Sequence, residues 1–76
     1  MAIVSHEWIS INCLCLNDEQ NRMAVVLEAL PSGQTVRISD TRSGERTLRY
    51  EPMRDGVVEA LIRIAKEFGY TADPPD

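Results

Sequence analysis

The stretch NDEQNRMAVVLEAL, residues 17–30, decides the fold, because its pattern fits both a helix and a strand. As a helix, Asn17 would cap the first turn, and Asp18 and Glu19 would lie at the positive end of the helix dipole. Gln20 would complete a capping box. The apolar residues would then fall at i, i+3, i+4 and i+7, namely Met23, Val26, Leu27 and Leu30.

As a strand, the same stretch places alternate apolar residues on one face: Met23, Val25, Leu27 and Ala29. That face would pair with the odd positions of a preceding strand, Cys15, Cys13, Ile11 and Ile9. The Ala, Leu, Met and Glu content favours the helix, and the strand stays open as the alternative.

The segments around this stretch are predicted as follows. Residues 3–16 read as one extended strand with an apolar face at the odd positions from Ile9 to Cys15. Residues 34–51 read as an antiparallel hairpin, and a helix ends at Phe68, followed by Gly69 as its stop. The sequence therefore predicts an α+β domain of order β-α-β-β-α. The alternative is a four-stranded antiparallel meander with one C-terminal helix. We expect one domain over residues 1–70 and a flexible tail over residues 71–76, which hold Pro74 and Pro75.

The hairpin register follows from its turn, TRSG, in which Gly44 can take a left-handed conformation. Placing Thr41 opposite Glu45 pairs Ile38 with Leu48. The same register sets Arg37 directly opposite Arg49.

Length and charge limit the classes of function that the chain can have. The chain has 76 residues and a formal net charge of −4, which argues against direct DNA binding. No stretch resembles a signal peptide or a membrane span, so we expect a cytoplasmic protein with no membrane contact.

The two cysteines, Cys13 and Cys15, are interpreted as buried strand residues and not as a metal or redox site. Two positions apart on a strand, they lie at or past the limit of disulfide geometry. The single histidine, His6, falls on the other face of an uninterrupted strand, and the four glycines are isolated. The sequence predicts no enzyme activity, no metal and no cofactor.

Residues 34–54 form a basic segment with five arginines in an otherwise acidic chain. Opposed arginines across a strand pair are destabilising unless an acidic group lies between them, such as Glu28 or Glu51. Bidentate arginine contacts suit carboxylates and phosphates. Trp8, the only tryptophan, is a candidate contact residue, and acidic side chains could enter a basic channel of a partner. The predicted partner-binding residues are Arg37, Arg49, Arg42, Trp8, Asp18 and Glu19.

The segment LEALPSGQTVRISDTRSGERTLRYEPMRDGVVEALIRIA resembles the α-β-β-α plan of small phage head–tail joining proteins. In its size and acidic charge, the whole chain is similar to small phage and mobile-element inhibitors of the anti-CRISPR type. This resemblance implies a non-enzymatic protein that blocks or modulates a protein or nucleoprotein complex. The alternatives are a phage structural or assembly protein of the connector kind and a nucleic-acid-binding module that uses the arginine-rich hairpin. We also expect the small domain to form a homodimer.

Overall fold

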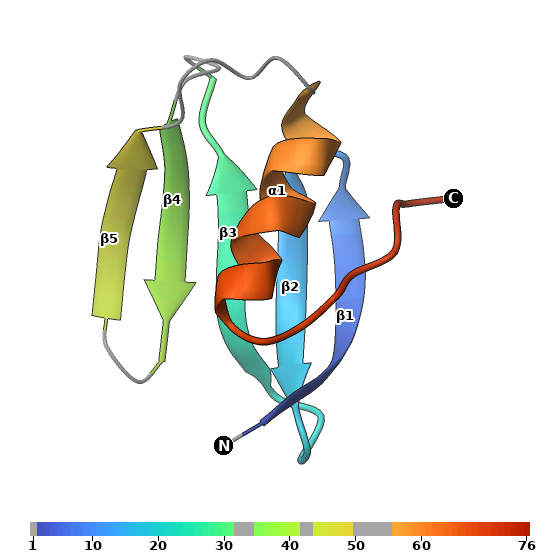
Figure 1. Cartoon of the computed structure of the whole chain (residues 1–76). Helices are drawn as coiled ribbons and strands as arrows, with labels where there is room; N and C mark the ends of the chain where they lie inside the picture. The colour runs from blue at the N-terminus through green and yellow to red at the C-terminus, as the bar shows by residue number, and fades with distance from the viewer. Residues whose placement is uncertain (1, 32–34, 42–43, 50–55) are drawn as a thin grey trace.

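Five strands form a single antiparallel sheet in which every strand pairs with its neighbours along the chain (Figure 1). The computed structural model describes residues 2–31, 35–41, 44–49 and 56–76, and for residues 45–49 the backbone alone. The strands are β1 (Ile3–Ser10), β2 (Cys13–Asp18), β3 (Met23–Ala29), β4 (Thr35–Asp40) and β5 (Gly44–Arg49). One helix, α1 (Gly56–Glu67), follows them and lies across one face of the sheet (Figure 1).

The predicted helix over residues 17–30 is wrong, and the alternative meander with one C-terminal helix is confirmed. The predicted cap is Asn17, but Asp18 supplies the accepting oxygen and does so in a hairpin loop: its Oδ1 accepts the backbone N–H groups of Gln20 (2.9 Å) and Arg22 (3.0 Å). Asn21 has a φ of 60°, which turns the chain back into β3. Because β3 pairs with β2 on one side and β4 on the other, these long-range pairs override the local helix preference.

The single strand predicted over residues 3–16 is also wrong, because the chain turns at Ile11 and Asn12. The backbone N–H of Asn12 donates to Ser10 Oγ at 3.2 Å, and its carbonyl accepts the N–H of Ala29 at 2.8 Å. The meander therefore has one strand more than the predicted alternative. The turn leaves Ile11 65% exposed, although the continuous strand placed it on the predicted apolar face.

The hairpin of β4 and β5 exists, but the predicted register is wrong by two residues. Asp40 pairs with Gly44, and Ile38 pairs with Arg46 instead of Leu48. Thr41 lies beyond the last pair of this register, and its N–H and hydroxyl both donate to the carbonyl oxygen of Ala24 on β3. Gly44 takes the left-handed conformation as expected, with a φ of 87°, at the start of β5.

The core lies between α1 and the sheet, where the helix contacts β2 and β3. The strand residues that point into it include Leu14 and Leu16 of β2 and Val25 and Leu27 of β3. The helix buries Ala60, Leu61, Ile64 and Ala65 against the sheet. The largest side chains with no more than 1% exposure are Leu14, Leu16, Val25, Leu27, Val36, Ile38, Leu61 and Ile64.

After α1, the chain reverses and runs back over β1 on the same face of the sheet (Figure 1). Gly69, with a φ of 81°, makes this reversal, and its N–H donates to the Lys66 carbonyl at 2.9 Å. We call residues 70–76 the strap. Ala72 of the strap is 4% exposed and belongs to the core. The predicted flexibility concerns the motion of residues 71–76 and stays a prediction.

Candidate functional site

The face of the sheet opposite α1 is covered by no helix or strand among the described residues, and we call it the open face. Figure 1 shows the helix and the strap together on the other side of the sheet. The strand register and the alternation of side chains place a mixed set of polar and apolar residues on the open face. These residues are Glu7, Cys13, Cys15, Val26, Glu28, Arg37 and Ser39.

An ion pair crosses the open face between β3 and β4. Glu28 and Arg37 are register partners, and Arg37 Nη2 donates to Glu28 Oε1. Their side chains are 43% and 40% exposed, so solvent screens the pair. Glu28 was one of the two acidic residues expected to bridge the arginines, and it is the one found at Arg37.

The predicted opposition of Arg37 and Arg49 is wrong. Arg37 pairs with Thr47, and Arg49 pairs with Thr35. The destabilising repulsion that suggested an anion-binding stripe therefore does not arise from the register. Arg42 lies outside the described residues, as does the side chain of Arg49.

The two cysteines lie side by side on the open face as free thiols. Cys15 is buried and Cys13 half-buried. Burial, together with the nearby Cys13 and Glu7, raises the pKa of the Cys15 thiol to about 11. Burial and the charge of Glu28 also raise the pKa of Cys13. Thiols with raised pKa values stay protonated at neutral pH, where only the thiolate is a strong nucleophile or metal ligand. Within the described part of the chain, no cluster of three or more His, Cys, Asp or Glu side chains could hold a metal ion.

A shallow depression of about 200 Å³ lies where the open face meets the β4–β5 turn. Val26 and Ser39 of the open face line it, together with Met23, which is 58% exposed. The remaining lining residues are Asp40, Thr41 and Gly44. Sequence reasoning missed this depression, since Met23 was assigned to an apolar face in both readings of residues 17–30.

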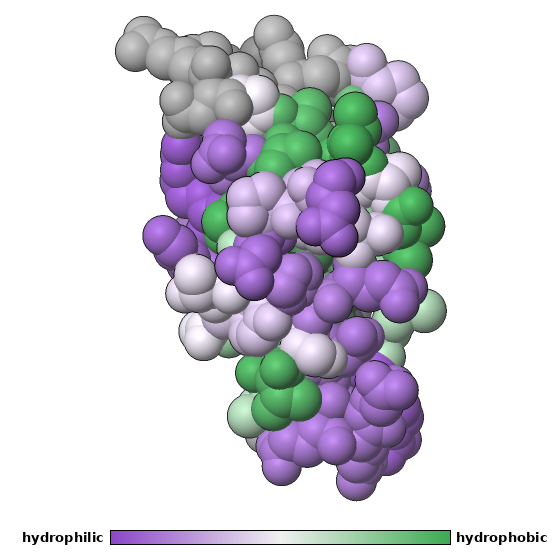
Figure 2. All heavy atoms as spheres, turned by 90° about the vertical axis from the view of Figure 1, so that its right-hand side faces the viewer, coloured by the Kyte–Doolittle hydropathy of each residue, from purple (hydrophilic) through white to green (hydrophobic). Residues whose placement is uncertain are grey.

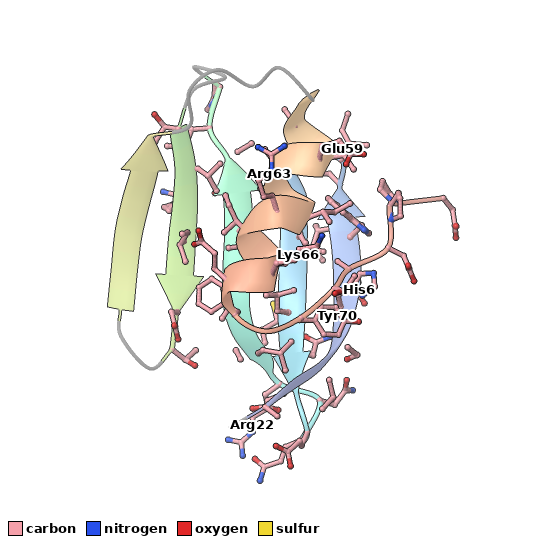
Figure 3. The ribbon with its side chains drawn as sticks, in the orientation of Figure 1. His6, Arg22, Glu59, Arg63, Lys66 and Tyr70 are labelled. Atoms are coloured by element: carbon pink, nitrogen blue, oxygen red, sulfur yellow. The ribbon has the colours of Figure 1, made fainter. Side chains whose placement is uncertain are left out.

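Trp8 lies on the helix side of the sheet, where the strap crosses β1. Its indole Nε1–H donates to the carbonyl oxygen of Asp73 at 2.8 Å. His6, two residues earlier on the same face, is hydrogen-bonded through Nδ1 to the hydroxyl of Tyr70 at 2.6 Å. Figure 3 shows His6 and Tyr70 next to each other at this crossing. Trp8 is therefore half-buried beneath the strap and separated from Arg37 by the sheet.

Asp18 and Glu19 lie in the turn between β2 and β3. Asp18 is 6% exposed, and its bonds from the backbone N–H groups of Arg22 and then Gln20 lower its pKa, against the opposing effect of burial. Glu19 is exposed and accepts the backbone N–H of Ala2 at 3.1 Å. Figure 2 shows this end of the molecule as a strongly hydrophilic surface. The Asp18 carboxylate is thus hydrogen-bonded within the turn, whereas the Glu19 carboxylate is exposed.

The predicted contact residues do not converge on one site. Arg37 lies on the open face, Trp8 beneath the strap, and Asp18 with Glu19 at the lower end of the sheet in Figure 1. The structure thus offers two separate surfaces, the open face with its depression and the strap side with Trp8.

Comparison with protein-family models, curated proteins and solved structures finds no match. Within the described residues, no helix has the length and apolar character that crossing a membrane requires.

Proposed function

We propose that this chain is a non-enzymatic binding protein that contacts a macromolecular partner through its open face. The observation that carries the proposal is the depression beside Met23 and Val26. A half-exposed methionine is a flexible, polarisable contact that adapts to a partner's surface. An apolar side chain of a partner, seated in the depression, would cover Met23 and be surrounded by the polar groups of Ser39 and Thr41. An apolar centre inside a polar rim is typical of protein–protein interfaces.

The ion pair supplies the second part of the contact. Glu28 and Arg37 neutralise each other on the open face, so a partner that covers them meets little net charge. Covering the pair would remove the water that screens it and would fix the orientation of the partner. In this proposal, Arg37 contributes to specificity together with Glu28, not as an isolated anion-binding group.

The state of the potential catalytic groups supports a binding function over an enzymatic one. Cys15 is buried with a raised pKa, and His6 is engaged by Tyr70. A nucleophile needs a base within hydrogen-bond reach, and His6 lies on the opposite side of the sheet from the thiols.

The specific form that we propose is an inhibitor of a host nucleoprotein complex, similar to the anti-CRISPR proteins in size and acidic charge. Such a protein works inside the cell and binds the protein component, with no direct contact to DNA. A connector-like assembly protein and a nucleic-acid module built on the β4–β5 hairpin are the rival functions. If the partner is a second copy of the chain, the same contact through the open face would form a homodimer.

Site-specific photo-crosslinking tests the proposal. A photoreactive amino acid is placed at Met23, and a control is placed at Ile11, which is also exposed (65%) but lies at the β1–β2 turn. We expect a crosslinked host protein from Met23 and none from Ile11, identified by mass spectrometry in cell extract. The reverse pattern, or crosslinks to nucleic acid alone, would contradict the proposal. A crosslink only to a second copy of the chain would identify self-association instead.

A further inference from the structure

The strap and β1 enclose a groove of about 500 Å³ on the helix side of the sheet. His6 and Trp8 of β1 form one wall, and the other wall consists of Asp73, Pro74, Pro75 and Asp76. The groove is held open by the contacts already described: Tyr70 to His6, buried Ala72, and the Asp73 carbonyl to the indole of Trp8.

The groove is acidic. The described residues that line it include the carboxylates of Asp73 and Asp76 but no lysine or arginine. Both aspartates are exposed residues, so their carboxylates are accessible to a ligand. The whole chain is acidic as well, which favours the approach of a cationic partner.

Trp8 supplies the second recognition element. Its Nε1–H is committed to the Asp73 carbonyl, which fixes the indole against the strap. The polar edge of the ring is therefore satisfied, and the ring remains half-buried at the wall of the groove. An indole face is the strongest aromatic partner for a cation. Two prolines opposite it add rigid, apolar surface.

We propose that this groove binds an arginine side chain of a partner protein. A guanidinium group is planar, stacks on an aromatic ring and pairs with carboxylates in a bidentate manner. It is also more weakly hydrated than an ammonium group, so it loses less hydration on entering the groove than lysine does. The groove lies on the other side of the sheet from the open face. A test of the groove therefore does not depend on the contact proposed for the open face.

Trp8 makes the test direct, because it is the only tryptophan and its fluorescence reports on the groove. The folded full-length chain is titrated with a short capped peptide that contains one arginine. Two matched peptides carry citrulline, an uncharged analogue of arginine, or lysine. We expect saturable quenching or a spectral shift with the arginine peptide at millimolar concentration, as suits a single side chain. We expect weaker binding of the lysine peptide and no binding of the citrulline peptide.

The variant Asp73→Asn/Asp76→Asn removes both carboxylates and keeps the backbone carbonyl that holds Trp8. We expect it to bind the arginine peptide about fivefold to tenfold more weakly. The control Glu59→Gln/Glu67→Gln removes the same number of charges from exposed positions of α1 and should bind as the wild type does. An equal loss in both variants would reduce the effect to overall charge. Equal binding of the citrulline or lysine peptide, or no saturable signal, would overturn the proposal.

Discussion

Tyr70→Phe isolates the hydrogen bond that ties the strap to β1. The hydroxyl of Tyr70 lies 2.6 Å from His6 Nδ1 in a partly buried place, and the two rings are 5.3 Å apart at a tilt of 59°. Phenylalanine keeps the ring contact and removes only the hydroxyl. A hydrogen bond of this kind contributes about 0.5–1.5 kcal/mol to the free energy of unfolding. For a domain of this size, 1 kcal/mol corresponds to a fall in the melting temperature of about 4–8 °C.

The measurement is a double-mutant cycle of Tyr70→Phe with His6→Ala, read by thermal and urea unfolding. His6→Ala alone also loses packing on β1, and the cycle removes that contribution. We expect a coupling energy of about 0.5–1.5 kcal/mol between the two positions. Thr71→Ala, at an exposed position one residue further along the strap, is the control and should leave stability nearly unchanged. A coupling energy of zero would refute the hydrogen bond as a tie between the strap and β1, and the strap would then be held only by buried Ala72 and the bond from Trp8 to Asp73.

Other variants test the sheet. Ile38→Ala, at a position with 0% exposure, should lower the free energy of unfolding by about 2–4 kcal/mol in urea denaturation; a loss as small as that of a surface change would mean that the assigned core face is wrong. Arg37→Gln should cost less than about 1 kcal/mol, because the ion pair with Glu28 is half-exposed, and a larger cost would make the pair a structural element. With a pKa of about 11, Cys15 should have only about one thiolate in a thousand molecules at pH 8 and should alkylate slowly until the chain unfolds. The pKa of Asp18 is lower in the folded than in the unfolded state, so its contribution is present at neutral pH and is lost as the pH falls through the folded value. Asp18→Asn should therefore flatten the acid side of a plot of melting temperature against pH, and an unchanged acid side would contradict the role of the turn.

Local sequence patterns predicted the structure correctly where the residues of a segment fit only one type of secondary structure. The C-terminal helix, its stop at Gly69 and the apolar face of β4 with Val36 and Ile38 follow directly from spacing. Local patterns failed where the same side chains can stabilise two different structures. Asp18 offers its oxygen to two backbone N–H groups in the hairpin loop, as a helix cap would. Only the pairing of β3 with β2 and β4 distinguishes the hairpin from the helix.

The candidate site depends even more on strand register and on how the strap docks. Arg37 meets Glu28 because β3 and β4 pair in one particular register, and the two-residue error in the β4–β5 hairpin shows how weakly local pairs fix a register. The groove joins Trp8 to Asp73, 65 positions away. Pro74 and Pro75 were read as the sign of a loose end, but Ala72 before them enters the core.

The order of the meander has a consequence for how the chain is made. All five strands precede α1 and the strap in the sequence, so a chain that ends before residue 56 holds every strand of the sheet but none of the residues that cover its helix side. In such a chain Leu14, Leu16 and Leu27 would face water on a surface that could associate with other chains. Pairing of neighbouring strands is local and favours rapid hairpin formation, whereas closure of the core waits for the last twenty or so residues. A ribosome that stalls before α1 would therefore release a sheet with an exposed apolar face, a form that chaperones and proteases recognise.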